Sequence, residues 1–322
     1  MSANSNVGIE LVFGGGSVGS GTAFAEPNTL KQALETLKQE DIQSIDTAHL
    51  YGESETILGN GKAGDDFLID SKIMGGFSPG SAKKESILKG IDESLLRLGV
   101  EKLRIFYIHA PDYETPLSET LVGINEAYLA NKFTRFGISN YKPEDVQAIY
   151  DHCKEKNYPL PTAYQGNYSA VARKPESTLL PLLRKLGISF YVYSPMAGGL
   201  LTKSRDDIFN GAGRFNESAP GGNIYTKMYK KPSYLDALAE WASIAADAGT
   251  SKSELAYRWV AHNSDLDPKY GDGLLIGARN IEQLQETISN IKKGSLSPEI
   301  AKRIAQLWIK LEPDAPMDNF HL

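Results

Sequence analysis

Eight short apolar runs recur along the 322 residues and are separated by longer amphipathic segments. One such segment places Ile87, Ile91, Leu95 and Leu98 about one helical turn apart before Gly99, which predicts a helix that ends at the glycine. Strands that alternate with helices in this way form a parallel sheet whose faces the helices cover. Eight such units are what a closed (β/α)₈ TIM barrel of the α/β class requires. The expected strands are residues 9–13, 42–46, 67–72, 103–109, 134–139, 162–165, 188–194 and 274–278.

No Pro/Ser-rich linker or change of composition divides the chain, so we expect one barrel domain over residues 1–322. The longest connection, at about residues 194–232, is rich in glycine and polar residues and follows the seventh strand. Connections of this length in compact domains are usually functional or disordered. Its position places it at the end of the barrel where active sites form.

Composition restricts the class of protein. The hydrophobic content of 41% and the charged content of 23% are ordinary for a soluble globular chain. The first residues do not resemble a signal peptide, and no run of apolar residues is long enough to span a membrane. We therefore expect a cytoplasmic protein, which also agrees with the single cysteine. The net charge of −6 disfavours nucleic acid and anionic membranes as partners.

Cys153 and the glycine-rich stretch after the first expected strand could each mark a functional site, but both are better explained by structure. Cys153 shares one helical face with Val146 and Ile149 behind Pro143, which predicts a core cysteine rather than a nucleophile. The stretch VFGGGSVGSG, residues 12–21, matches the spacing G-x-G-x-x-G. A dinucleotide fingerprint needs its glycines to open a helix directly, whereas here the helix is expected near Asn28. The match is interpreted as chance, although such a loop lets a ligand approach the backbone.

Polar residues at the ends of three expected strands point to chemistry. Asp46 ends the second strand, Lys72 the third and His109 the fourth, and Tyr51 follows Asp46 in the adjoining loop. The carboxyl ends of barrel strands meet at one mouth. An ammonium beside a phenol lowers the phenol's pKa from about 10, and Asp46 is expected to keep Lys72 charged. With His109 as a hydrogen-bond donor to a substrate oxygen, the set is typical of a site that protonates a carbonyl.

Each of these residues also has a purely structural interpretation. Asp46 is a candidate helix cap or the partner of Lys72 in a structural ion pair, and His109 beside Ala110 and Pro111 is a candidate core histidine. Four such residues at strand ends of one barrel favour the chemical interpretation. The few histidines and the one cysteine show no metal-ligand spacing.

Several motifs resemble those of a known superfamily. DTAHLYG (46–52), the segment around Lys72, YIHAPD (107–112) and GISNY (137–141) are similar to the aldo-keto reductases. SETILG, PTAYQGNYSA, FYVYSPMAGGLLTK and IEQL resemble the aflatoxin aldehyde reductase family more closely. The resemblance runs from about residue 9 to the end of the sequence. It implies a barrel enzyme that reduces aldehydes or ketones with NADPH and no metal, with Asp46, Tyr51, Lys72 and His109 as its catalytic residues.

The resemblance also implies which residues bind NADPH. By position, Ser139, Asn140 and Gln165 match family residues that hydrogen-bond the nicotinamide amide. Tyr193 matches the aromatic residue that stacks on the nicotinamide ring, and the loop with Lys203 and Arg214 resembles the family's pyrophosphate clamp. Gly277, Arg279, Gln283 and Glu286 align with the adenosine site, where an arginine near a helix N-terminus suits a 2′-phosphate. The expected cofactor contacts are Asp46, Ser139, Asn140, Gln165, Tyr193, Ser194, Pro195, Met196, Gly198, Leu200, Lys203, Arg214, Gly277, Arg279, Gln283 and Glu286.

Departures from the family pattern concern the cofactor and the substrate. Family members often carry serine near Arg279 and asparagine near Thr287. Aflatoxin aldehyde reductases end with an arginine that binds substrate carboxylates, whereas this sequence ends DNFHL, with Lys227 and Arg214 as candidate replacements. We therefore expect a larger, less charged carbonyl substrate. Its expected contacts are Tyr51, His109, Tyr113 and Tyr225, in an aromatic pocket that also holds Tyr168, Tyr229, Met228 and Phe320.

Two rival functions remain open at this point. The first is an NADP(H)-binding regulatory subunit that senses redox state with little turnover, a role that some relatives serve. The second is a barrel aldolase in which Lys72 forms a Schiff base. It needs a neutral lysine, whereas Asp46 would keep Lys72 charged. As a separate expectation, the closer relatives suggest a homodimer.

Overall fold

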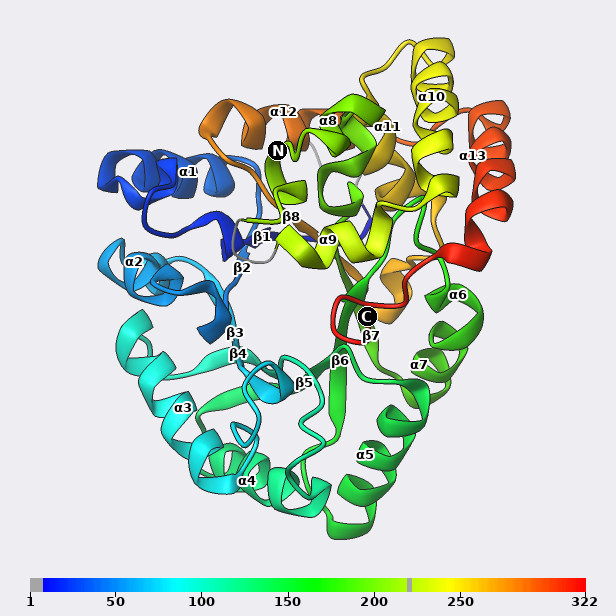
Figure 1. Ribbon diagram of the computed structural model, residues 1–322. Coiled ribbons are helices and arrows are strands. Elements are labelled where there is room, and N and C mark those ends of the chain that lie inside the picture. The colour runs from blue at the N-terminus through cyan, green and yellow to red at the C-terminus, as the bar shows by residue number, and fades with distance from the viewer. Residues whose placement is uncertain (1–7, 219–221) are drawn as a thin grey trace.

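A computed structural model describes residues 8–218 and 222–322. Eight parallel strands pair in chain order and close into a barrel when β8 pairs with β1, with helices around it (Figure 1). The predicted TIM barrel is confirmed, and the strand boundaries differ from the expected ones by only a few residues. The strands are β1 (Glu10–Gly14), β2 (Ser44–Asp46), β3 (Leu68–Ile73), β4 (Leu103–Ile108), β5 (Phe133–Ser139), β6 (Pro161–Asn167), β7 (Ser189–Tyr193) and β8 (Gly273–Ile276).

The helices begin and end where local sequence signals place them. Gly99 ends α3 in a left-handed conformation with φ of 66°, and Pro143 opens α5, whose Cys153 is buried in the core as predicted. The helices are α1 (Pro27–Gln39), α2 (Ser54–Asn60), α3 (Lys84–Leu98), α4 (Leu117–Leu129), α5 (Pro143–Lys156), α6 (Pro175–Thr178), α7 (Leu180–Leu186), α8 (Arg205–Phe209), α9 (Gly222–Tyr229), α10 (Pro232–Asp247), α11 (Lys252–Arg258), α12 (Ile281–Lys292) and α13 (Pro298–Leu311).

Side chains inside the barrel alternate with side chains that pack against the helices, as the two-residue period of strands requires. Val12, Ile105, Tyr107, Ala163, Tyr191 and Leu275 form a separate inner cluster, whereas Phe13, Phe106 and Val192 belong to the core under the helices. The inner tyrosines need space across the barrel. A Cβ on Gly137 would lie 2.3 Å from the Tyr107 ring and one on Gly273 2.6 Å from the Tyr191 ring, so glycine is required at both positions.

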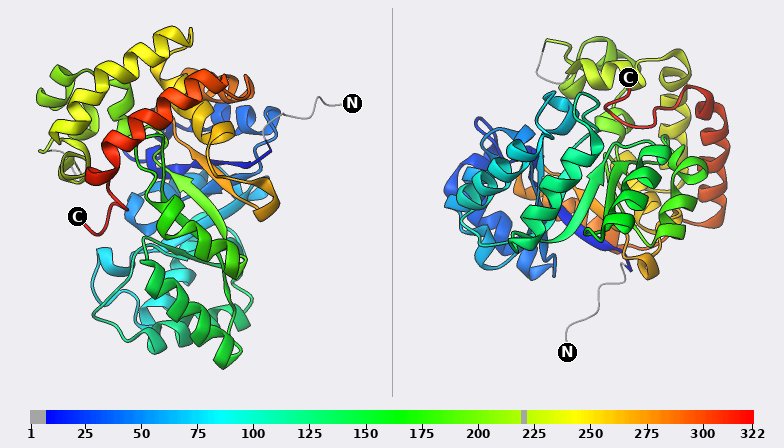
Figure 2. Two further views of the ribbon diagram at one scale, coloured as in Figure 1. Left: turned by 90° about the vertical axis from the view of Figure 1, so that its right-hand side faces the viewer. Right: turned by 90° about the horizontal axis from the view of Figure 1, so that it is seen from below.

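The carboxyl end of the barrel is covered by connections and by residues 315–322. The long connection after β7 holds a 3₁₀ turn at Ala197–Thr202, then α8 and α9. Residues 315–322 lie near α9 at this end, opposite the end where β1 begins (Figure 2), and the side-chain amide of Asn319 lies 3.0 Å from Tyr193 Oη. The glycines after β1 lead into short 3₁₀ turns, and α1 begins only at Pro27. They do not open a helix, as predicted.

None of the helices in residues 8–218 and 222–322 is both long enough and apolar enough to cross a membrane.

Candidate active site

Asp46 and Lys72 meet inside the barrel because their strands are neighbours and both side chains occupy inward positions. Lys72 Nζ donates to both carboxylate oxygens of Asp46, at 2.7 and 2.6 Å, and to the backbone oxygen of Thr47 at 2.8 Å. Gln165, on β6, donates to Asp46 Oδ1 at 2.8 Å. The ammonium thus has three acceptor atoms, and the carboxylate has a second donor.

Tyr51 and His109 lie next to this ion pair. Tyr51 ends a short 3₁₀ turn after β2, and Lys72 Nζ is 5.1 Å from the centre of its ring. The rings of Tyr51 and His109 meet edge to face with centres 5.7 Å apart. The structure therefore brings all four predicted catalytic residues together.

The charges of these groups follow from burial and from Lys72. Burial lowers the pKa of Lys72, but the Asp46 carboxylate opposes it and the pKa ends above its ordinary value. Lys72 is therefore an ammonium, as predicted. Burial lowers the pKa of His109 well below its ordinary range, and Lys72 lowers it further, so the imidazole is neutral and holds one N–H donor.

The expectation that the pKa of Tyr51 falls below its ordinary value is wrong. Burial raises this pKa, Lys72 lowers it and Asp46 raises it again, and the net direction is upward. Desolvation of a phenolate outweighs an ammonium whose charge Asp46 already offsets. Tyr51 is therefore a protonated phenol at neutral pH.

A cavity of about 310 Å³ opens beside Tyr51 at the carboxyl end of the barrel, and we call it the catalytic cavity. Asp46, Tyr51 and His109 line it. Many residues that the resemblance implied for the cofactor or substrate also line it: Gln165, Tyr193, Ser194, Pro195, Met196, Gly198, Arg214, Tyr225, Gly277, Arg279 and Gln283.

Asn140 links the strand ends on one side of this cavity. Its Nδ2 donates to the backbone oxygen of His109 at 2.9 Å, and its Oδ1 accepts from Tyr193 Oη at 2.7 Å. Its φ of 61° is left-handed, which asparagine tolerates better than most residues. Ser139 Oγ and His109 Nδ1 are buried with no hydrogen-bond partner in the part of the chain that the structure describes, and unpaired buried polar atoms of this kind are rare in folded proteins.

Three cations gather around Gly213, of which Arg214 and Arg279 line the cavity whereas Lys203 does not. A Cβ on Gly213 would lie 3.4 Å from Arg279 Nη2 and 3.5 Å from Lys203 Nζ, so these two cations approach the same point. Arg214 lies over the Tyr225 ring and donates to its hydroxyl at 2.6 Å. Within residues 8–218 and 222–322, neither Lys203, Arg214 nor Arg279 forms an ion pair. This uncompensated positive charge suits a polyanionic ligand.

Some predicted contacts lie outside the catalytic cavity. Leu200 is buried in the core, Glu286 is exposed on α12, and Ser139, Asn140 and Lys72 lie behind the lining residues. Tyr113 is 63% exposed, and its hydroxyl contacts Asp145 and His321.

The predicted aromatic pocket needs correction at three further positions. Tyr168 and Tyr229 are buried, because Tyr168 packs between Phe190 and Trp259 and Tyr229 packs on Tyr234. Met228 lines a neighbouring cavity instead, and so does Lys227, the candidate replacement for the terminal arginine.

The sequence reasoning missed other residues at the site. Phe77 stacks edge to face on His109, with ring centres 5.1 Å apart, and also stacks at 5.2 Å on Phe320, which is predicted from the sequence to lie in the aromatic pocket. Asn319 comes from a segment without periodicity, and no local signal marks it. The remaining unpredicted lining residues are Gly14, Gly16, Ser17, Leu50, Gly199, Tyr257, Leu275, Ile276 and Ala278, of which the glycines belong to the loop after β1 and to the long connection. Among the described residues, no three His, Cys, Asp or Glu side chains are grouped to hold a metal ion.

Comparison with known proteins identifies the family. A sequence model of the Aldo/keto reductase family matches residues 10–309. The oxidoreductase sirO of Leptosphaeria maculans is 37% identical over 316 residues, which cover 95% of each chain. Aflatoxin B1 aldehyde reductase member 2 of Rattus norvegicus is 34% identical over 314 residues, which cover 91% of this chain and 83% of the rat protein. The resemblance seen in the motifs is confirmed, and the chain belongs to the aldo/keto reductase family of oxidoreductases.

Proposed function

We propose that this protein reduces an aldehyde or ketone to the alcohol with NADPH, and that Tyr51 protonates the carbonyl oxygen. The observation that carries the proposal is the buried ion pair of Lys72 and Asp46 beneath the Tyr51 ring, at the base of a cavity that His109 also lines. Family membership supports an oxidoreductase, and this arrangement supplies the proton that carbonyl reduction consumes.

The proposed acid chemistry follows from the charges at the site. Tyr51 holds its proton at neutral pH because burial raises its pKa, so an acid is present when a carbonyl substrate arrives. The Lys72 ammonium would stabilise the phenolate that remains after proton transfer. The neutral His109 would donate a hydrogen bond to the same oxygen and orient it toward Tyr51.

The cavity fits the nicotinamide cofactor that the proposal needs. Gln165 lines the cavity with its Nε2 bound to Asp46, so its Oε1 would accept from the carboxamide. Ser139, its register partner on β5, has a buried hydroxyl without a partner among the described residues, and Asn140 follows it with one Nδ2–H bound to the His109 backbone oxygen. Lys203, Arg214 and Arg279 would hold phosphates at the far end, and a 2′-phosphate there favours NADPH over NADH. When bound, this cofactor supplies the hydride.

The aromatic side chains above His109 support an apolar carbonyl substrate. Phe77 and Phe320 form a continuous edge-to-face stack that begins at the His109 ring. Arg214, the candidate replacement for the carboxylate-binding arginine, contacts Tyr225 and is assigned to the cofactor phosphates in this proposal, so it would not bind a substrate carboxylate. We therefore propose an aromatic or otherwise apolar aldehyde or ketone as the substrate class.

The experiment that tests the function is the rate of NADPH oxidation with aromatic, aliphatic and carboxylated aldehydes, measured beside NADH. In the Tyr51→Phe variant, turnover should fall by about 10²- to 10⁴-fold, while the dissociation constant for NADPH stays the same. Tight NADPH binding without turnover by the unsubstituted protein would favour a regulatory, redox-sensing subunit. Trapping of a substrate on Lys72 by borohydride would favour a Schiff-base aldolase.

A further inference from the structure

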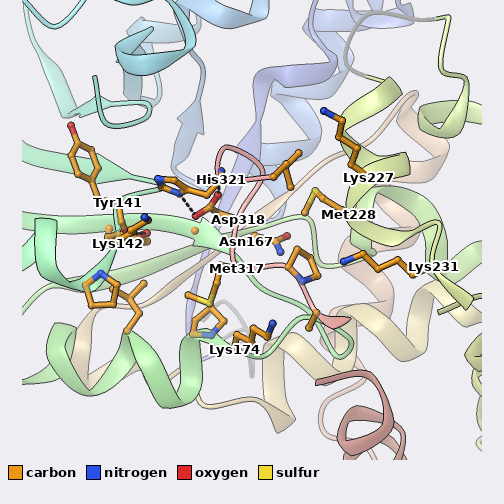
Figure 3. A pocket seen from close by; sticks show the side chains of 18 residues that line it. Tyr141, Lys142, Asn167, Lys174, Lys227, Met228, Lys231, Met317, Asp318 and His321 are labelled. Atoms are coloured by element: carbon orange, nitrogen blue, oxygen red, sulfur yellow. Dashed lines mark hydrogen bonds and ion pairs between the residues drawn. The ribbon is translucent and has the colours of Figure 1, made fainter. Parts of the chain in front are cut away.

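A second cavity of about 550 Å³ lies beside the catalytic cavity. Its walls are the start of α5, the end of β6, the start of α6, the junction of α9 with α10, and residues 315–322 (Figure 3). Asp46, Tyr51, Lys72 and His109 do not line it. Neither the proposed reduction nor the proposed cofactor contacts make use of this space.

Four lysines surround this second cavity. Lys142 precedes α5, Lys174 precedes α6, and Lys227 and Lys231 lie at the junction of α9 with α10 (Figure 3). Lys231 Nζ donates to the backbone oxygen of Asp314 at 2.7 Å. Among residues 8–218 and 222–322, none of the four lysines has a carboxylate within ion-pair distance. These lysines make the rim of the cavity locally positive in a chain whose net charge is −6.

The nearby carboxylates are already used elsewhere. Asp318, the only acidic side chain in the lining, accepts hydrogen bonds from the backbone N–H of Phe320 and His321 and pairs with His321 Nδ1 at 2.9 Å. Asp314 accepts from Ser233, and Glu176 pairs with Arg173. None of these three carboxylates therefore pairs with the lysines, and an external anion can contact their ammonium groups, although Lys142 and Lys227 are exposed and water screens part of the attraction.

Apolar side chains form the rest of the lining. Met228, Leu179 and Tyr164 are almost completely buried and present little surface to water. Pro143 and Met317 are only partly buried and Leu322 is exposed, so these lining side chains leave apolar surface open to water. A ligand with an apolar body would cover that surface and gain hydrophobic free energy.

From this combination we infer that the second cavity binds a small organic anion: an aromatic or branched apolar body that carries a carboxylate, sulfonate or phosphate. The apolar body would rest on Met317, Pro143 and Leu322, and the anionic group would face the lysines. The charge-assisted hydrogen bonds of ammonium groups are the strong contacts in such a site.

Residues 315–322 separate this anion site from the catalytic cavity. Asp318 and His321 line the second cavity, whereas Asn319 lines the catalytic cavity and contacts Tyr193. Phe320, between them, stacks on Phe77. The two sites share one wall and no lining residue, so a ligand can occupy either without occupying the other.

The test uses the fluorescent anion 8-anilino-1-naphthalenesulfonate with the full-length protein. We expect saturable binding, with the dissociation constant raised about tenfold in the Lys174→Gln/Lys227→Gln double variant, the value of one charge-assisted hydrogen bond. The neutral probe N-phenyl-1-naphthylamine has the same rings without the sulfonate. It should bind the unsubstituted protein more weakly than the anionic probe does, and its affinity should be the same for the unsubstituted protein and the double variant. Should the double variant fail to fold, as judged by circular dichroism, each single variant replaces it.

Two matched variants locate the bound probe. Lys154→Gln/Lys302→Gln removes the same charge from exposed lysines that form no ion pair with described residues and lie outside both cavities. Arg214→Gln removes a cation from the catalytic cavity. Neither should change the affinity for the anionic probe. Absence of saturable binding, equal affinity for the neutral probe, or an equal loss in either matched variant would overturn the inference.

Discussion

The ammonium of Lys72 lies 2.6 Å from Asp46 Oδ2, and the two side chains are 0% and 1% exposed. Neither charge could stay in the barrel interior without the other, because removing a single ion from water costs several kcal/mol. The same pair lies beneath the Tyr51 ring. Stability and the proposed acid chemistry therefore depend on one contact, and a single substitution should affect both.

Asp46→Asn should lower the free energy of unfolding by about 3 to 5 kcal/mol, because it leaves a buried lysine without its carboxylate. The urea midpoint measures this loss, and turnover should fall with it. Asp66→Asn is the matched control, since its partner Lys38 and Asp66 itself are about half exposed and such pairs contribute at most about 1 kcal/mol. Similar losses in the two variants would show that Asp46 and Lys72 gain nothing from being buried together.

The pH dependence of catalysis should follow the proton on Tyr51. Reduction needs the phenol, which exists below the pKa of Tyr51 and is lost above it. Because burial raises this pKa above its ordinary value, kcat for reduction should stay level through neutral pH and fall only above about pH 10. Oxidation of the alcohol needs the phenolate, so its rate should rise with pH over the same alkaline range.

The measurement is kcat in both directions from about pH 6 to about pH 10.5, with circular dichroism to show that the protein stays folded. His109 should add no step near its ordinary pKa, because burial keeps it neutral. A fall in the reduction rate that begins near neutral pH would contradict the raised pKa of Tyr51.

The sequence predicted the parts of this site that depend on strand order. Asp46, Lys72 and His109 end strands whose apolar runs are easy to recognise, and a closed barrel then brings their side chains to one mouth. The direction of the Tyr51 pKa could not be predicted in the same way. It depends on how far the ring is desolvated, which is decided by segments distant in the sequence.

The same limit applies to the aromatic residues. Tyr168 and Tyr113 look alike as tyrosines after strand ends, yet Tyr168 is core and Tyr113 is at the surface. Asn319 reaches the catalytic cavity from a segment without helical or strand periodicity, so only tertiary structure places it. Phe320, expected in the aromatic pocket, stacks on Phe77 and is not among the residues that line the cavity.

Arg279→Ala should raise the KM for NADPH by about 10- to 100-fold, the value of a lost hydrogen bond between charged groups. The KM for NADH should change much less, because NADH lacks the 2′-phosphate that Arg279 is proposed to hold. Steady-state kinetics with both cofactors measure the difference. Lys302→Ala, which removes an exposed cation from α13, serves as the control. Equal increases in KM for NADPH and NADH would show that Arg279 does not bind the 2′-phosphate.

Phe320→Ala should lower kcat/KM for aromatic aldehydes by about tenfold and leave small aliphatic aldehydes nearly unchanged. The reason is the edge-to-face stack from His109 through Phe77 to Phe320, which presents an aromatic surface beside the proposed substrate oxygen. Phe320→Leu keeps an apolar side chain without a ring, so its kcat/KM for aromatic aldehydes should lie between the values of the unsubstituted protein and Phe320→Ala. The KM for NADPH should stay constant, because the predicted phosphate contacts lie at the opposite end of the cavity. Equal losses for aromatic and aliphatic aldehydes would mean that Phe320 supports the position of residues 315–322 rather than substrate choice.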